Sequence, residues 1–386
     1  MPSGAGKSAG RTLALLHPAF ALTGVLQAVG GPLLPSLASS FHLNDNESGL
    51  MFLLYFAGTS LGALFCRGNY ARTMALGFMG IAVCCVGVAA AGRSLLPPLF
   101  LLLGISVGIP MTAISLFAGR NFPERCAPIL TFLNFSWSAG ALAAPLLAAQ
   151  VLVHHSYRAA YGVLALPAAA AALACWMLLK DAPEAARVPR EKEGFTNFRI
   201  ILVFALAAFL QVGMENTASV WLSTYSLRLV GKGFALAAAA ASLYWFGFLA
   251  SRGFSSALLL RAEPVRVLRA AVAVALAAAL LLAGLPGFAG GTVAMFMLGA
   301  ALAPIYPLIV AGAFARVRRT SDARWVLATA GFGGSVLPWL AGWISAHTGS
   351  LRVGMLVLPA ALVLMALMLP TLGAQRQALV DEQAGS

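Results

Sequence analysis

Acidic residues are scarce in this chain. Its 386 residues include 12 Asp and Glu against 25 Lys and Arg, and only 10% of the residues are charged, whereas 60% are hydrophobic. The mean hydropathy of +0.88 exceeds what a soluble core needs, which excludes an ordinary soluble protein. Every acid except Glu215 falls in an expected connector or tail. Because a carboxylate in an apolar segment is costly to insert, Glu215 is a candidate functional group.

Cysteine is also sparse, and its placement excludes other chemistry. The five cysteines show no metal-type spacing, so we expect small core residues, with neither a metal site nor a disulfide framework. A membrane enzyme would need a clustered nucleophile or metal set, which the sequence lacks, so we predict no enzyme activity and no cofactor. The net charge of +13 is not arranged on a basic, aromatic-interleaved face, so we predict no nucleic-acid partner.

Long hydrophobic runs, by contrast, recur along the whole chain. Each is close to the roughly 20 residues that cross a bilayer as a helix. The fold class is therefore an all-α integral membrane protein with twelve transmembrane helices. The predicted spans are 12–38, 48–66, 73–91, 95–118, 128–150, 158–180, 199–227, 234–257, 266–285, 290–314, 325–346 and 352–373.

Basic residues gather on one side of the predicted membrane. When alternate connectors are assigned to opposite sides, the minority side receives only Arg93, Arg158, Arg228, Lys232 and Arg352. Since positively charged connectors stay in the cytoplasm, this bias predicts that both termini are cytoplasmic. We therefore expect a multi-pass protein of the plasma (inner) membrane, with lipid as its surroundings.

The chain divides near its middle. The longest polar segment between spans is rich in charge and proline, which is typical of a linker. Residues 1–180 are predicted to form one six-helix bundle, 181–198 a cytoplasmic linker, and 199–386 a second six-helix bundle. The halves also resemble each other: Gly58 precedes Arg72 by the interval that separates Gly247 from Arg261. Two such repeats, related by an axis along the membrane normal, are the arrangement of major facilitator transporters.

Four segments carry a closer resemblance. Residues 41–49, 303–308, 333–339 and 349–352 resemble the fucose permease branch, the fucose:proton symporters, of the major facilitator superfamily. The resemblance implies two pseudo-symmetric bundles, alternating access, and a pathway lined by the first, fourth, seventh and tenth spans. Two departures stand out. Cys66 precedes Arg67 where the family carries an acid, and the first span has Gln27 but no acid, whereas proton-coupled relatives have one.

The polar residues of these spans supply the candidate site. Gln211, Glu215 and Tyr225 follow helical spacing, which places amide, carboxylate and phenol on one helix face. The predicted substrate-binding residues are Gln27, Thr112, Asn134, Trp137, Gln211, Asn216, Trp221, Tyr225, Tyr306 and Trp339. Several of these amides are equally compatible with structural hydrogen bonds between helices. The predicted cytoplasmic gate consists of Arg67, Arg72, Arg120 and Arg252.

Glu215 is the predicted cation-coupling residue. Every Lys and Arg is assigned to a span end or beyond, so no buried basic group is expected beside it. A carboxylate without such a partner binds a mobile cation, which is a proton, a sodium ion or a cationic substrate; a structural hydrogen bond is the alternative role. The expected absence of a buried basic group also disfavours organic phosphates as cargo.

We therefore predict a monomeric secondary transporter that couples a cation gradient, of protons or sodium, to uptake of a sugar or sugar-like solute. The alternative is a proton-driven exporter of amphipathic or cationic compounds.

Overall fold

The protein is a bundle of helices. The computed structural model describes residues 3–66, 69–122, 126–179, 198–230, 233–258, 261–284, 287–316 and 320–373, and within these ranges it contains no strand. The α-helices are α1 (Ser3–Phe41), α2 (Asp45–Leu64), α3 (Tyr70–Ala90), α4 (Leu96–Asn121), α5 (Cys126–Leu152), α6 (Tyr157–Leu179), α7 (Phe198–Val230), α8 (Phe234–Leu258), α9 (Pro264–Gly284), α10 (Phe288–Leu302), α11 (Ile305–Arg316), α12 (Thr320–Thr348), α13 (Leu351–Gly354) and α14 (Val357–Gly373). A 3-10 turn, Arg93–Leu95, precedes α4.

The predicted spans all fall on these helices. Ten are single helices, while the tenth and twelfth spans are each interrupted, between α10 and α11 and between α13 and α14. In the tenth span the interruption falls at Ala303 and Pro304, because proline has no N–H to continue the helical ladder. The predicted linker lies outside the described residues, except for Phe198, which begins α7.

Eleven spans in the described part of the chain are long and apolar enough to cross a membrane. The remaining one, α12, is more polar. It packs along α7 within its own half and along α2 of the other half, so less of its surface has to face lipid. The prediction of an all-α protein with twelve spans is confirmed.

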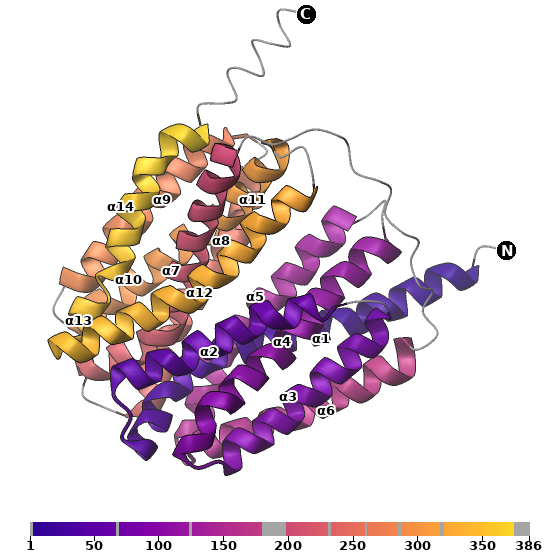
Figure 1. Ribbon diagram of the computed structural model, residues 1–386, viewed down its shortest axis with the longest axis horizontal. Helices are drawn as coiled ribbons and strands as arrows, with labels where there is room; N and C mark the ends of the chain where they lie inside the picture. The colour runs from indigo at the N-terminus through magenta and orange to yellow at the C-terminus, as the bar shows by residue number, and fades with distance from the viewer. Residues whose placement is uncertain are drawn as a thin grey trace, which may run out of the picture.

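The helices form two bundles, α1–α6 and α7–α14 (Figure 1). Each bundle repeats the same pairings: α1 with α5 and α7 with α12, α2 with α4 and α8 with α10, α3 with α6 and α9 with α14. Between bundles, α2 packs against α12, α5 against α8, and α1 against α7. The pairings make the two bundles pseudo-symmetric, as expected.

Glycines at equivalent places let the paired helices touch. A Cβ on Gly104 of α4 would overlap the carbonyl oxygen of Tyr55 of α2, and a Cβ on Gly299 of α10 would overlap that of Tyr244 of α8. Such close backbone approach is how helices associate where lipid supplies no hydrophobic drive. Tyr55 and Tyr244 are thus pseudo-equivalent residues.

Equivalent glycine contacts also relate α1 of the first bundle to α7 of the second. A Cβ on Gly140 of α5 would overlap the carbonyl oxygen of Ala21, and a Cβ on Gly333 of α12 would overlap that of Phe209. Counting six residues along each helix from Ala21 and Phe209 leads to Gln27 and Glu215. The amide of the first bundle therefore stands where the second bundle has its carboxylate.

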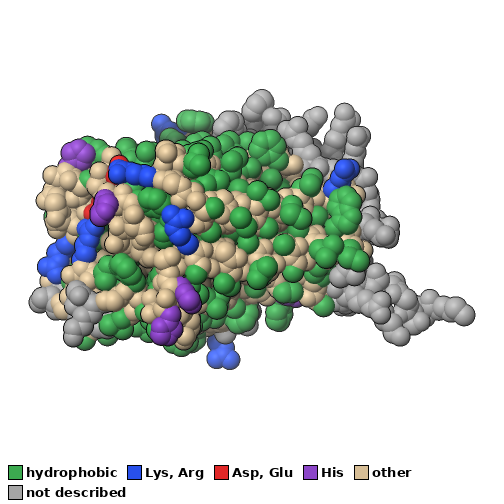
Figure 2. Space-filling view, turned by 90° about the horizontal axis from the view of Figure 1, so that it is seen from below, with side chains coloured by type: hydrophobic (Ala, Val, Ile, Leu, Met, Phe, Trp, Pro, Cys, Tyr) green, Lys and Arg blue, Asp and Glu red, His purple; other side chains and the backbone are tan. Residues whose placement is uncertain are grey.

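The two ends of the molecule differ. Because successive spans alternate in direction, the start of α1 and the end of α14 lie at one end, which we call the termini end (Figure 1). The turn between α1 and α2 marks the opposite end, the α1–α2 end. Charged and histidine side chains gather at one end of the face drawn in Figure 2, while hydrophobic side chains cover its middle. This distribution fits a membrane-embedded belt.

The close approach at Gly299 yields a stability prediction. In Gly299→Ala the added methyl group must displace the backbone of α8, so we expect a loss of about 1–3 kcal/mol. The matched control is Gly253→Ala on α8, where the methyl group meets nothing within 4 Å, and which gains helix propensity instead. The melting temperature in detergent should fall for Gly299→Ala and hold or rise for Gly253→Ala; equal behaviour of the two variants would contradict the packing described.

Candidate functional site

Glu215 lies near the middle of α7. Its side chain keeps partial solvent exposure although protein surrounds it. The titratable groups that interact with it electrostatically are Arg252 and Tyr244 of α8 and Tyr306 of α11. Tyr306, which sequence analysis selected as a binding residue, is therefore close enough to the carboxylate to interact with it electrostatically.

Arg252 corrects one sequence-based expectation. It lies within α8, whose described residues run to Leu258, and its guanidinium reaches the interior, where it interacts with Glu215. The expectation that no basic group lies beside Glu215 is therefore wrong. The physical reason is that hydrogen-bonding and aromatic groups hold the guanidinium at this depth, so an arginine can lie inside a span and not only at its end.

The groups that hold Arg252 belong largely to the other bundle. Its Nη1 donates hydrogen bonds to Ser138 Oγ at 2.7 Å and to the Asn134 carbonyl oxygen at 3.4 Å, both on α5. Its guanidinium lies 4.6 Å from the centre of the Phe248 ring and 5.8 Å from that of Trp137, within cation–π range. Arg252 thus joins α8 of the second bundle to α5 of the first.

Aromatic side chains continue this site. Trp137 and Trp245 meet edge to face across the bundles with ring centroids 5.8 Å apart. Among the described residues, Trp137 Nε1 and the Tyr244 hydroxyl are buried without a hydrogen-bond partner. An unsatisfied buried polar group costs about 1–3 kcal/mol, so these two donors are suited to a ligand. Together with Glu215, Arg252 and Tyr306 they form what we call the interior site.

Sequence reasoning missed part of this site. Ser138 was not selected, and Tyr244 and Trp245 were not distinguished from ordinary core aromatics. A signal was nevertheless present, because Trp245, Phe248 and Arg252 follow steps of three and four and so share one helix face. An arginine on an aromatic helix face, inside a predicted span, is a usable indicator of an interior cation.

Four predicted binding residues of α7 are engaged within their own bundle. Gln211 Nε2 donates to the Leu302 carbonyl oxygen at 2.9 Å, beside the break between α10 and α11. The Tyr225 hydroxyl donates to the Leu282 carbonyl oxygen of α9 at 2.6 Å.

The other two bond α12: Asn216 Nδ2 donates to the Gly334 carbonyl oxygen at 3.3 Å and Trp221 Nε1 to that of Pro338 at 2.8 Å. In this structure all four side chains join helices to each other.

Three other predicted binding residues lie on different helices of the first bundle. Gln27 is half-buried and its Oε1 lies 3.5 Å from the Tyr55 hydroxyl. Thr112 is half-buried on α4, and Asn134 Nδ2 donates to a carbonyl oxygen of its own helix.

Of the predicted gate residues, Arg72 lies over the Trp176 ring of α6, inside the first bundle. Arg67 and the side chain of Arg120 lie outside the described residues.

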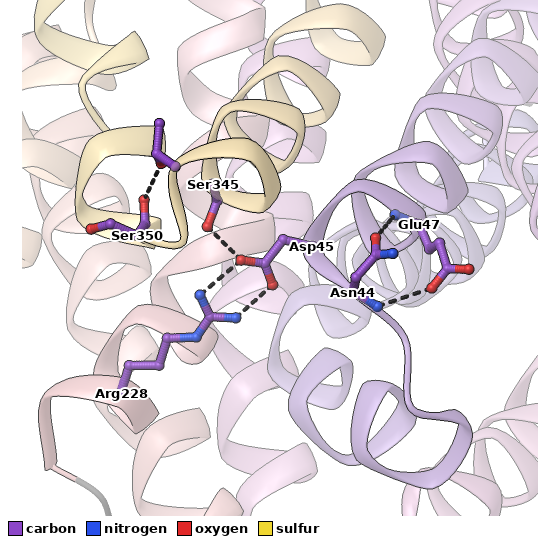
Figure 3. A network of polar contacts seen from close by, with 7 residues as sticks. Asn44, Asp45, Glu47, Arg228, Ser345 and Ser350 are labelled. Carbon is purple, nitrogen blue, oxygen red and sulfur yellow. Dashed lines mark hydrogen bonds and ion pairs between the residues drawn. The ribbon is translucent and has the colours of Figure 1, made fainter.

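A second cluster joins the bundles at the α1–α2 end, and sequence analysis did not find it (Figure 3). The Asp45 carboxylate of α2 accepts hydrogen bonds from Arg228 Nη1 and Nη2 of α7, at 2.8 and 2.5 Å, and from Ser345 Oγ of α12 at 2.5 Å. We call these three residues the Asp45 clasp. Trp339 Nε1, a predicted binding residue, donates to Asn46 Oδ1 beside it at 3.2 Å.

A helix cap positions Asp45. Asn44 Oδ1 accepts a hydrogen bond from the Glu47 backbone N–H, and Glu47 Oε2 accepts one from the Asn44 N–H, so the two residues form a capping box. The cap begins α2 at Asp45, which fixes the carboxylate toward α7 and α12. Sequence analysis had placed both Asp45 and Arg228 in connectors, where their pairing is not visible.

Two pseudo-symmetric membrane bundles, joined by polar contacts at two depths, are the architecture of a membrane transporter. The model of the Major Facilitator Superfamily matches residues 16–324. The chain belongs to this superfamily and is a multi-pass membrane transporter of small molecules.

Solved structures of other members are similar in fold. A bacterial homologue of the human lysosomal transporter Spinster, in an inward-facing and occupied conformation, has 14% identity and a TM-score of 0.77, covering 95% of this chain and 97% of that one. The Escherichia coli fucose:proton symporter has 20% identity and a TM-score of 0.64, covering 94% and 98%. The nucleoside transporter NupG has 12% identity and a TM-score of 0.77, covering 93% and 98%. No curated protein matches the sequence.

The Asp45 clasp makes a testable contribution to this conformation. In Asp45→Ala we expect the bundles to separate more often at the α1–α2 end. The side-chain exposures of Arg228 and Asp45 are 45% and 14%, so we expect an effect on the order of 1 kcal/mol, roughly a fivefold change in population. Spin labels at the exposed positions Ser40 and Thr348 report the distance between bundles.

The control for that variant is Glu263→Ala, which removes an acid paired with nearby Arg266, at 3.1 Å. Longer distances are expected for Asp45→Ala alone. If both variants keep the same distance distribution as the parent protein, the clasp does not hold the bundles together.

Proposed function

We propose that the protein is a proton-coupled secondary transporter that works by alternating access and takes up a small, hydroxyl-bearing, sugar-like solute. The observation that carries this proposal is the position of Glu215. Its partly exposed carboxylate lies in the interior beside Tyr306, Tyr244 and Arg252. A lone acid in a membrane interior is the usual group for a coupling cation.

Arg252 favours a proton over sodium. A guanidinium close to the carboxylate repels a metal cation electrostatically, whereas a proton binds one carboxylate oxygen covalently and leaves a neutral acid. The same repulsion disfavours a cationic cargo. A proton-driven exporter of cationic compounds is therefore the weaker alternative, although the direction of transport depends on gradients as well as on geometry.

The orientation follows from the basic residues. The positive-inside bias places the termini end in the cytoplasm and the α1–α2 end outside, in a plasma (inner) membrane. The Asp45 clasp then closes the outer side, so this conformation is closed to the outside. Since both bundles come from one chain, a monomer suffices for alternating access.

The lining of the interior site suits a hydroxylated ring. Trp137 and Trp245 supply aromatic rings of the kind on which a sugar ring stacks, and Trp137 Nε1 and the Tyr244 hydroxyl are donors for ligand oxygens. The similar solved structures include a fucose:proton symporter and a nucleoside transporter, and both of those cargoes contain a sugar ring. This likeness supports a sugar-like cargo.

The test is transport by protein reconstituted in liposomes. A panel of sugars, sugar acids and nucleosides is offered with an inward proton gradient, and separately with a sodium gradient alone. We expect accumulation with the proton gradient only. In Glu215→Gln the side chain keeps hydrogen-bonding capacity but cannot release a proton, so accumulation should be lost while exchange of substrate across the membrane continues.

The matched control is Glu263→Gln, which alters an acid paired with nearby Arg266, outside the interior site and the Asp45 clasp, and should leave accumulation unchanged. Full proton-driven accumulation by Glu215→Gln would overturn the assignment of the coupling residue. Accumulation driven by sodium alone would overturn the assignment of the ion.

A further inference from the structure

We propose that α12 bends at Pro338 when the bundles separate at the α1–α2 end, and that Asn216 is the positioning residue that connects this hinge to Glu215. The hinge divides α12 into an inner arm, residues 320–337, and an outer arm, residues 339–348. The connection to Glu215 rests on the proposed coupling role of that residue, whereas the hinge itself does not.

The hinge lies where α12 loses a backbone hydrogen bond. Pro338 is inside the helix and has no N–H, so the carbonyl oxygen of Gly334, four residues earlier, lacks its helical donor. Asn216 Nδ2 of α7 donates to this oxygen at 3.3 Å. Gly334 makes room for the amide, because a Cβ at this position would overlap Asn216 Nδ2. A side chain of α7 therefore takes the place of the missing backbone donor.

The outer arm carries contacts to the first bundle. Trp339 Nε1 donates to Asn46 Oδ1 at 3.2 Å. Ser345 Oγ donates to the Asp45 carboxylate at 2.5 Å (Figure 3). Between these two contacts, a Cβ on Gly342 would overlap the backbone carbonyl oxygen of Asp45. Separation of the bundles at the α1–α2 end therefore has to displace the outer arm from α2.

The two arms are held to α7 in different ways. On the inner arm, a Cβ on Gly333 would overlap the carbonyl oxygen of Phe209, so the two backbones touch. At the start of the outer arm, Trp221 Nε1 donates to the Pro338 carbonyl oxygen at 2.8 Å, and the ring of Trp221 lies against Gly342. A side chain can rotate to follow a moving helix, whereas two backbones in contact cannot. The outer arm is therefore the freer of the two, as a hinge between them requires.

Pseudo-symmetry shows that the amide is confined to one bundle. Pro145 of α5 corresponds to Pro338 of α12, since each lies five residues after the glycine whose Cβ would overlap α1 or α7. The residue of α1 that corresponds to Asn216 is Ala28, whose side chain has no donor. A proline at this place does not by itself require an amide from the neighbouring helix. The amide accompanies the bundle that contains Glu215.

Asn216 directly follows Glu215 in α7. Successive side chains of an α-helix point about 100° apart, so one turn of α7 directs the carboxylate to the interior site and the amide to α12. A proton or substrate that shifts this turn also shifts the amide against the Gly334 carbonyl oxygen. The contacts then continue through the outer arm to the Asp45 clasp, which gives a continuous path from the coupling residue to the closed end.

The decisive measurement separates bending of α12 from rigid rotation of the whole bundle. Spin labels are placed at the exposed positions Thr348, on the outer arm, and Leu281, on α9 of the same bundle. The matched pair joins Leu281 to the exposed Phe332 of the inner arm. In Asp45→Ala we expect a displaced Thr348–Leu281 population about fivefold larger than in the parent protein, with the Phe332–Leu281 distances unchanged.

Rigid rotation would leave both distances within the second bundle unchanged. An unchanged Thr348–Leu281 distribution in Asp45→Ala would therefore overturn the hinge, whatever happens between the bundles.

Pro338→Ala tests the position of the hinge. The variant supplies an N–H for the Gly334 carbonyl oxygen, so in the Asp45→Ala background we expect the displaced population to fall by roughly 2- to 10-fold, the effect of one hydrogen bond. Pro145→Ala makes the same change in α5 and should leave the population as it was. A population that survives Pro338→Ala, or that falls equally in Pro145→Ala, would overturn the hinge.

Asn216→Leu tests the connection to Glu215. A coupling acid that loads from outside binds its proton more tightly in the outward-open state, so by linkage Glu215→Gln, which resembles the protonated acid, should enlarge the displaced population roughly fivefold or more. We expect this response to disappear in Asn216→Leu, and also in Gly334→Ala, which displaces the amide without altering α7.

The possible results distinguish the connection, the hinge and the proposed function. A response to Glu215→Gln that persists in both of those backgrounds, or that is absent from the parent protein, would overturn the connection and leave the hinge standing. Proton-driven accumulation in liposomes is a separate measurement, and its absence would overturn the proposed function whichever way these distances fall.

Discussion

The organising constraint of this molecule is the free-energy cost of placing charge inside a bilayer. Glu215 and Arg252 are tolerated because they interact with each other and because neutral groups of α5 and α8 hold the guanidinium. The pair lies where the two bundles meet, so any movement of one bundle against the other changes its surroundings.

The repeated fold supplies a neutral frame around that pair. Glycines bring α4 onto α2 and α10 onto α8 at equivalent places, with Tyr55 and Tyr244 supplying the contacted carbonyl groups. Gln27 and Glu215 occupy equivalent positions, yet only the second is an acid. The two halves share their packing and differ in their chemistry, so the charged groups were set independently of the fold.

Much of the fold, but less of the site, could be predicted from the sequence. Hydropathy located the spans, and a single acid in an apolar run located Glu215, because both depend on the transfer of individual residues into lipid. Helical spacing placed Gln211 and Tyr225 on one face, but it could not show that α9 and α10 occupy that face. Arg252 and the pairing of Asp45 with Arg228 depend on contacts between distant segments, which local pattern does not encode.

The exposure of the Asp45 clasp has a consequence for the response of the protein to its medium. Arg228 is 45% exposed, so mobile ions reach the clasp, and at physiological ionic strength electrostatic screening acts over about 8 Å. Salt in the medium at the α1–α2 end therefore weakens the clasp, which makes the separation of the bundles at this end sensitive to ionic strength.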